Sequence, residues 1–289
     1  MAASSVFVTA PDGLKLHVRE YGPRNSRRPA VVCLPGLTRT AEDFDAFALA
    51  LAARGRRVLA LDSRGRGRSD YDDDPGNYTL PVELADLMGV LTACEAEPAV
   101  FVGSSRGGLL TMLLAAQRPM AIAGAILNDI GPVIEPKGLM RIKGYVGKLP
   151  IPRNYGEAGE ILRRLFGHQF PNLDDAAWEA SARRAWREEN GRMVVTYDVN
   201  LAHTLKGFDA DSPIPPLWPQ FDALSRMPLM LVHGALSDIL SAETVAAMAG
   251  RCRGMEVIEV ADQGHTPLLS GDIVSRLTSF VERCDARAA

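Results

Sequence analysis

The sequence has no apolar run long enough to cross a lipid bilayer. A membrane-spanning helix needs about 20 consecutive apolar residues, and no stretch of this chain approaches that length. Residues 1–10 also lack the basic and apolar regions of a secretory signal peptide. These absences predict a protein that is soluble, cytoplasmic and not bound to a membrane.

Cysteine is scarce, and it occurs in no recognisable pattern. The four cysteines, Cys33, Cys94, Cys252 and Cys284, are far apart and form no C-x-x-C pair. We therefore expect reduced thiols rather than a disulfide scaffold. The histidines, cysteines and carboxylates show no spacing typical of a metal site, so we expect neither a metal nor another cofactor.

A strong excess of one charge is missing as well. The chain has 32 Lys and Arg against 35 Asp and Glu, which gives a formal net charge of −3. The basic residues are spread out, and no zinc-finger or RNP motif is present. This distribution gives no electrostatic reason to expect nucleic acid as a partner. Nothing in the sequence indicates an oligomeric state.

The chain does contain alternating short apolar runs and amphipathic helical patterns. Its 289 residues exceed the usual size of one domain, and its hydrophobic content of 47% is ordinary for a globular protein. The runs expected to be strands are 6–9, 15–21, 30–34, 57–61, 99–102, 122–127, 229–232 and 255–260. Strands that alternate with helices predict a parallel sheet covered on both faces.

This alternation stops after Gly131 and resumes near Leu229. Residues 133–226 contain helical patterns but no run typical of a central strand. We therefore predict a helical cap at 133–226, inserted between a first core segment at 1–132 and a second at 227–289.

One strand-to-helix junction contains a nucleophile motif. Gly103-Ser104-Ser105-Arg106-Gly107 follows a predicted buried strand, precedes an apolar helix and matches the pattern G-x-S-x-G. A strand that turns at once into a helix strains the central residue, so the residues two before and two after it must be small. The pattern predicts that the Ser105 hydroxyl stands clear at the end of the strand. The alternative is a Gly- and Ser-rich loop that only connects the two elements.

Ser105, Asp238 and His265 each follow a predicted strand, and the carboxyl ends of parallel strands meet at one edge of a sheet. Serine needs a base within hydrogen-bond reach to act as a nucleophile, and histidine can take and return its proton. A carboxylate on the other ring nitrogen fixes the tautomer. We therefore predict a catalytic triad of these three residues.

The acid of this triad has two candidates. Asp238 follows a late strand, although it could instead cap the next helix. Asp129 also ends a strand, and it comes earlier in the chain. We assign the acid to Asp238.

Five motifs together resemble the α/β-hydrolase superfamily. They are Leu34-Pro35-Gly36, the loop 62–69, the motif 103–107, Ser237-Asp238 and Gly264-His265. The chain order Ser, Asp, His is also the order of that superfamily. The resemblance is to the capped branch of esterases, lactonases and C–C hydrolases, and it covers about two thirds of the chain (both core segments). It implies an α/β-hydrolase fold, with a mostly parallel eight-stranded sheet, helices on both faces and an inserted helical cap.

The same resemblance implies an activity. We expect a serine hydrolase that cleaves a small carboxylic ester or lactone through an acyl-enzyme. The alternatives are a C–C bond hydrolase of a ring-cleavage product and a non-catalytic ligand-binding protein of the same fold. Serine at the nucleophile position argues against dehalogenase and epoxide-hydrolase chemistry, because those relatives attack with a carboxylate. The loop 62–69 resembles a structural loop of the branch, and it lacks the third glycine of a dinucleotide motif.

The resemblance also implies two backbone donors for an oxyanion hole, the N–H groups of Leu37 and Arg106. Arg106 is an unusual residue after the nucleophile. Some haloacetate dehalogenases of the superfamily have arginine there, where it binds a substrate carboxylate. We therefore predict that the Arg106 side chain binds substrate; the alternative is that it turns away and pairs with an acid such as Asp129.

Overall fold

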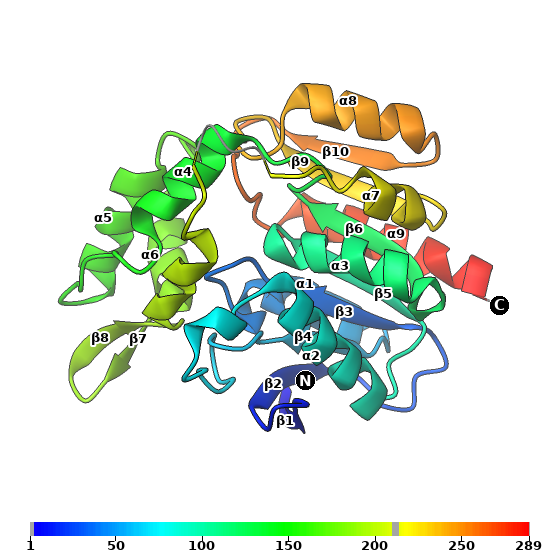
Figure 1. Cartoon of the computed structure of the whole chain (residues 1–289), viewed down its shortest axis with the longest axis horizontal. Coiled ribbons are helices and arrows are strands. Elements are labelled where there is room, and N and C mark those ends of the chain that lie inside the picture. Colours follow the sequence, from blue (N-terminus) through cyan, green and yellow to red (C-terminus); the bar gives the residue numbers. More distant parts are fainter. Residues whose placement is uncertain (1–2, 210–213, 289) are drawn as a thin grey trace.

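An eight-stranded sheet runs through the centre of the computed structural model, which describes residues 3–209 and 214–288 (Figure 1). The strand order is β1-β2-β4-β3-β5-β6-β9-β10. Only the pairs β1–β2 and β2–β4 are antiparallel among the paired strands of this sheet in the described residues. The strands are β1 (Ser4–Thr9), β2 (Lys15–Tyr21), β3 (Ala30–Leu34), β4 (Val58–Leu61), β5 (Ala99–Ser104), β6 (Ile122–Asn128), β9 (Leu229–Gly234) and β10 (Glu256–Val260). The predicted mostly parallel eight-stranded sheet is confirmed.

Helices cover both faces of this sheet because its central strands are apolar on both sides. Successive side chains of a strand point to opposite faces, so Val32 and Leu34 of β3 join one core cluster, whereas Val31 and Cys33 join the other. Helices α2 (Leu80–Ala93), α3 (Arg106–Gln117), α7 (Trp218–Leu224) and α8 (Ala242–Arg251) contribute to the first cluster. Helices α1 (Asp45–Ala52) and α9 (Asp272–Ala288) contribute to the second. Short 3₁₀ helices lie at η1 (Ala41–Phe44), η2 (Pro75–Asn77), η3 (Pro119–Ala121) and η4 (Val199–Leu205).

A second group of elements lies to one side of the sheet (Figure 1). It comprises α4 (Pro136–Tyr145), α5 (Tyr155–Phe166), α6 (Asp175–Ala185) and the hairpin of β7 (Trp186–Glu189) and β8 (Arg192–Val195). Helices α5 and α6 and the hairpin have an apolar cluster of their own, which includes Leu162, Phe170, Trp178 and Trp186, whereas Ile142 of α4 belongs to a core cluster of the sheet. We interpret this group as the cap.

The packing of helix α7 indicates an earlier end of the cap than the expected residue 226. Helix α7 lies within the expected range, yet Phe221 and Leu224 are fully buried in the core cluster of the sheet, together with Leu110 of α3. Residues 210–213 of the expected cap lie outside the described residues. We therefore propose that the cap ends before α7, because that helix covers the sheet.

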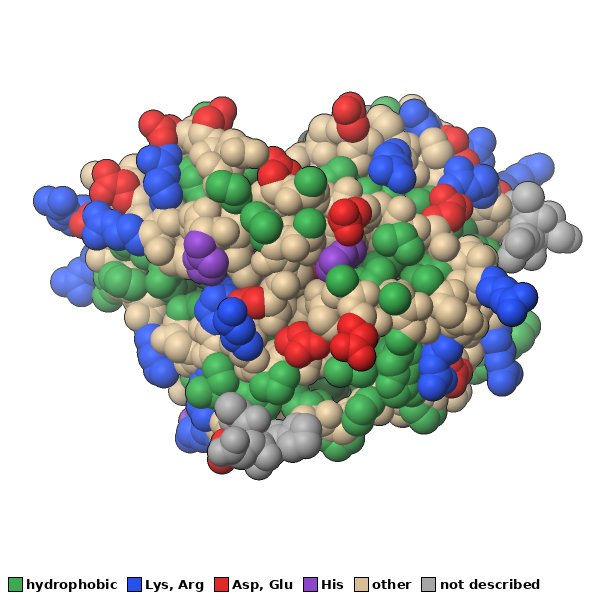
Figure 2. All heavy atoms as spheres, turned by 90° about the horizontal axis from the view of Figure 1, so that it is seen from above, with side chains coloured by type: hydrophobic (Ala, Val, Ile, Leu, Met, Phe, Trp, Pro, Cys, Tyr) green, Lys and Arg blue, Asp and Glu red, His purple; other side chains and the backbone are tan. Residues whose placement is uncertain are grey.

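The surface shows no large area of one charge on the face seen in Figure 2, where acidic, basic and apolar side chains are intermixed. The four cysteines are free and buried. Across residues 3–209 and 214–288, no helix combines the length and the apolar character that a membrane span requires.

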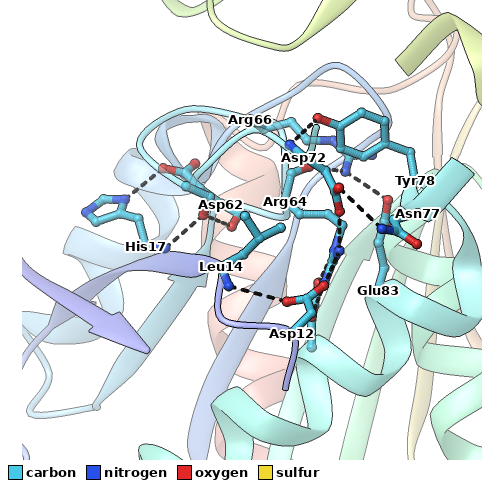
Figure 3. A network of polar contacts seen from close by, with 12 residues as sticks. Asp12, Leu14, His17, Asp62, Arg64, Arg66, Asp72, Asn77, Tyr78 and Glu83 are labelled. Carbon is cyan, nitrogen blue, oxygen red and sulfur yellow. Dashed lines mark hydrogen bonds and ion pairs between the residues drawn. The ribbon is translucent and has the colours of Figure 1, made fainter. Parts of the chain in front are cut away.

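The loop after β4 is held by buried polar contacts. Asp62 lies 2.7 Å from Nδ1 of His17 and accepts backbone hydrogen bonds from Ala41 and Arg68. Arg64, labelled in Figure 3, forms a bidentate ion pair with Asp86, at 2.6 and 2.7 Å, and a second ion pair with Asp72 at 2.7 Å. These polar side chains bind other groups of the protein, which agrees with a structural role for the loop.

Glu83 of α2 connects this loop to the helix that follows the nucleophile motif. Its two carboxylate oxygens accept hydrogen bonds from Nη1 of Arg66, at 2.8 Å, and from Nε of Arg106, at 2.9 Å. Arg66, labelled with Glu83 in Figure 3, also donates to the carbonyl oxygen of Leu37 at 2.7 Å. Burial alone would raise the pKa of Glu83, but the guanidinium groups of Arg106 and Arg66 outweigh it and lower the pKa to about 2.

We expect Glu83→Gln to lower the free energy of unfolding at pH 7 by about 3–5 kcal/mol, because it leaves two buried guanidinium groups without a counter-charge. The carboxylate stabilises the fold above its ordinary pKa of 4.5, and this contribution is lost as the pH falls toward about 2. Urea unfolding at a series of pH values should therefore show the gap between wild type and variant narrowing below pH 4.5.

The matched control is Glu179→Gln, which removes the same group from an exposed ion pair with Arg183. Exposed pairs contribute little, so this variant should unfold at the wild-type urea concentration. An equal loss of stability in the two variants would contradict a special role for Glu83.

Candidate active site

Ser105 sits at the turn between β5 and α3 in a strained backbone conformation, with φ 49° and ψ −115°. This turn is possible because the residues around it are glycines. A Cβ at Gly103 would lie 2.6 Å from the carbonyl oxygen of Gly107, and a Cβ at Gly107 would lie 2.1 Å from the carbonyl oxygen of Leu34. Backbone strain of this kind is characteristic of functional sites. The prediction that small residues must flank Ser105 agrees with these contacts.

His265 approaches Ser105 from the loop after β10. Its Nε2 atom lies 2.8 Å from the Oγ of Ser105, and its side chain is only 7% exposed. The loop crosses directly over Gly234, where a Cβ would lie 2.6 Å from the carbonyl oxygens of Gln263 and Gly264. The structure therefore brings together the predicted nucleophile and the predicted base.

The carboxylate beside His265 belongs to Asp129, the residue that follows β6. Its Oδ2 atom lies 2.8 Å from Nδ1 of His265 and accepts a hydrogen bond of 2.6 Å from the Ser237 hydroxyl. Its Oδ1 atom accepts the backbone N–H of Gly234 at 2.9 Å. The side chain is fully buried, so these donors compensate the desolvation of its charge. With its proton on Nδ1, the imidazole donates to Asp129 and accepts from the Ser105 hydroxyl.

The expectation that Asp238 is the acid partner of His265 is wrong in this structure. Asp238 forms a bidentate ion pair with Arg141 of α4, at 2.6 and 2.7 Å. Burial alone would raise the pKa of Asp238, but Arg141 outweighs it and lowers that pKa. Helix α4 packs directly over this segment, since a Cβ at Gly138 would lie 2.3 Å from the Asp238 carbonyl oxygen.

The expectation that the Arg106 side chain binds substrate is also contradicted. Its guanidinium turns back into the core, where Nε donates to Glu83 and Nη2 donates to the carbonyl oxygen of Tyr78 at 3.2 Å. Arg106 is not among the residues that line the cavity over Ser105. The alternative that it turns away holds, although its partner is Glu83 rather than Asp129.

The two backbone N–H groups expected to form an oxyanion hole belong to Leu37, which lines the cavity beside Ser105, and Arg106, the first residue of α3. Within the described ranges 3–209 and 214–288, neither N–H donates to a protein acceptor. The arginine–glutamate contacts described above hold the segments that carry both groups, because Arg66 binds the Leu37 carbonyl and Glu83 binds the Arg106 side chain.

A cavity of about 490 Å³ lies over Ser105, between the sheet and the cap. The volume lies within the range of small-ligand pockets. Its apolar wall comes mainly from the cap, with Ile142, Leu149, Leu162, Phe166, Phe170, Leu173 and Trp178. Its charged lining includes Arg39 and Arg184, which the sequence analysis did not identify. No cluster of three or more potential metal ligands was found in the described part of the chain.

Sequence reasoning had a signal for Asp129, because this residue directly follows a predicted strand next to the strand of Ser105. It had no signal for Ser237 as a partner of Asp129. The two arginines of the cavity lie 145 positions apart, in segments with unremarkable composition, so only the fold shows that they share a wall.

Comparison with known proteins agrees with this architecture. Residues 31–277 match the family described as the alpha/beta hydrolase family. An alpha/beta hydrolase from Novosphingobium aromaticivorans DSM 12444 has a similar crystal structure, with a TM-score of 0.90 and 40% sequence identity, covering 98% of this chain and 99% of that one.

Two further relatives carry functional names. The 3-hydroxybutyrate-oligomer hydrolase of Cupriavidus necator is 32% identical over 279 residues, covering 89% of each chain. The sn-1-specific diacylglycerol lipase ABHD11 of Xenopus tropicalis is 28% identical over 269 residues, covering 88% of this chain and 78% of that one. The expectation of an enzyme rather than a non-catalytic protein is confirmed. The chain belongs to the alpha/beta hydrolase family and is a hydrolase.

Proposed function

We propose that this hydrolase cleaves small carboxylic esters or lactones through an acyl-enzyme, with a triad of Ser105, His265 and Asp129. The observation that carries the proposal is the continuous chain of contacts from the Ser105 hydroxyl through the imidazole to a fully buried carboxylate, with 2.8 Å at each step. The names of the relatives, an oligomer hydrolase and a lipase, support hydrolysis of esters. The C–C hydrolase alternative stays a prediction without a specific observation in its favour.

The reaction follows from these contacts. His265 Nε2 takes the proton of the Ser105 hydroxyl as Oγ attacks the ester carbonyl carbon. The carbonyl oxygen becomes an oxyanion, which the N–H groups of Leu37 and Arg106 stabilise. Asp129 holds the imidazole in place and stabilises its positive charge. The tetrahedral intermediate collapses, the alcohol leaves with the proton from His265, and an acyl-Ser105 ester remains.

The second half of the reaction hydrolyses the acyl-enzyme and regenerates the free enzyme. His265 takes a proton from water, whose oxygen attacks the acyl carbon. The carboxylic acid leaves as Oγ of Ser105 regains its proton. The apolar wall of the cavity contacts the hydrocarbon of the acyl group, while the carbonyl end faces the donors of Leu37 and Arg106. For a lactone the released alcohol stays attached to the acyl chain, so one product forms.

We expect Ser105→Ala to lower kcat for p-nitrophenyl butyrate by about 10⁴–10⁶-fold, because it removes the atom that forms the acyl-enzyme. The variant should keep the wild-type circular dichroism spectrum, since an alanine Cβ occupies the same place. Activity within tenfold of the wild type would exclude the serine mechanism.

We expect Asp129→Asn to lower kcat by about 10³–10⁴-fold, because an amide cannot stabilise the imidazolium and favours the wrong tautomer. The matched variant is Asp238→Asn, whose carboxylate contacts Arg141 and not His265. It should retain activity within about tenfold of the wild type.

Both aspartate variants should be assayed below their melting temperatures, so that loss of fold is separated from loss of chemistry. A larger loss in Asp238→Asn than in a folded Asp129→Asn would overturn the assignment of the acid.

A further inference from the structure

Two arginines from opposite sides of the cavity converge in its polar region. Arg39 comes from the sheet domain, just before η1, and Arg184 comes from α6 of the cap. Both line the cavity that contains Ser105 and His265, and their side chains are 31% and 27% exposed. The proposed hydrolytic steps use neither of them.

Arg39 lies close to the nucleophile. The two side chains lie on the same side of Gly36: a Cβ placed there would lie 3.4 Å from Cγ of Arg39 and 3.7 Å from Cβ of Ser105. When the carbonyl carbon of a substrate meets the Ser105 hydroxyl, a group only a few bonds away in the same substrate therefore comes close to the Arg39 side chain.

The two guanidinium groups share a single carboxylate. Arg39 donates to both oxygens of Asp43 at 2.6 Å, and Nε of Arg184 lies 3.2 Å from Oδ1 of the same group. Arg184 also donates to the Ser181 hydroxyl at 3.2 Å. Among the residues that the structure describes, neither Nη1 group donates to a protein acceptor.

Two other acids at this edge of the cavity, Glu42 and Asp45, attract Arg184 from a greater distance than Asp43 does. Glu42 and Asp45 are paired with Arg19, at 2.9 and 3.0 Å, and their side chains are half exposed, so water screens them. Burial lowers the pKa of Arg184, and Arg39 beside it acts in the same direction against the attraction of Asp43. The two guanidinium groups are thus held at close range with only one carboxylate, Asp43, in direct contact with both.

We propose that Arg39 and Arg184 bind a carboxylate carried by the substrate, so that the preferred substrates of this hydrolase are anionic esters. The Nη1 groups of the two arginines are the donors left for this carboxylate, and charge-assisted hydrogen bonds of this kind are stronger where water is partly excluded. The apolar cap wall, with Phe166, Phe170 and Trp178, then accommodates the hydrocarbon between the carboxylate and the ester. This inference rests on the proposed hydrolysis of esters at Ser105.

The carboxylate could be on the acyl group or on the alcohol, and paired esters distinguish the two. On the acyl side, monoethyl succinate is compared with ethyl butyrate. On the alcohol side, 3-(butyryloxy)butanoate is compared with sec-butyl butyrate. Acid release is followed by titration, and the quantity of interest is the ratio of kcat/KM for the anionic ester to that for its neutral analogue.

We expect the wild type to have a ratio of at least tenfold in one of the two pairs. Arg184→Met and Arg39→Met should each lower that ratio by roughly 10- to 100-fold, the range for hydrogen bonds to a charged group. The matched control is Arg183→Met, because Arg183 lies next to Arg184 on α6 but pairs with the exposed Glu179. This control should keep the wild-type ratio.

Direct binding separates the inference from the proposed function. Calorimetry with Ser105→Ala should detect binding of monoethyl succinate or 3-(butyryloxy)butanoate, and adding Arg184→Met should weaken this binding by at least tenfold. This result would support the carboxylate site even if the wild type hydrolysed none of the esters, which would contradict only the proposed function. If the wild type hydrolyses the neutral esters equally well, or if both arginine variants keep its ratio, the inference is overturned.

Discussion

The Ser105 hydroxyl can stand at the end of β5 only because the second and third residues of α3 are glycines, so that the helix packs closely against the sheet. A Cβ at Gly107 would lie 2.1 Å from the Leu34 carbonyl oxygen, and a Cβ at Gly108 would lie 2.2 Å from Cγ2 of Ile130. These contacts fix the start of α3 against β3 and the end of β6. The same close packing places the N–H of Arg106 beside Ser105, so the proposed nucleophile and a proposed donor for the oxyanion depend on one steric constraint.

A buried carboxylate extends this constraint to the other side of the site. Glu83 holds the side chain of Arg106, and it also holds Arg66, which binds the Leu37 carbonyl oxygen. Both segments proposed to stabilise the oxyanion are therefore attached to α2 through one acid. Asp129 has a corresponding role on the opposite side, where backbone and hydroxyl donors hold it against His265. Acids in the interior thus position the groups that face the substrate.

The sequence was sufficient for the sheet and for two members of the site, because each depends on local patterns. Apolar runs predict buried strands, and the glycine spacing around Ser105 predicts its sharp turn. The third member depends on which strand end faces His265. Asp129 and Asp238 both follow strands, and only the packing of α4 shows that Asp238 faces Arg141 instead.

The roles of the arginines show a similar limit. Arg106 adjoins the nucleophile in sequence, yet its side chain is held in the core by Glu83, a residue from another helix. Arg39 belongs to the sheet domain and Arg184 to the cap, so the two side chains line one cavity only because these two parts pack together. A position next to the nucleophile therefore fixes where a backbone N–H lies, but not where a long side chain points.

The most direct test of the account is covalent labelling of the nucleophile. A p-nitrophenyl alkylphosphonate should react once per chain, releasing p-nitrophenol, and peptide mass spectrometry should place the phosphonyl group on Ser105. The neighbouring Ser104 provides an internal comparison, because its hydroxyl is bound by the Asn128 amide and does not contact His265. A label on Ser104 or elsewhere, or no label on a folded and active enzyme, would contradict the assignment of Ser105 as the nucleophile.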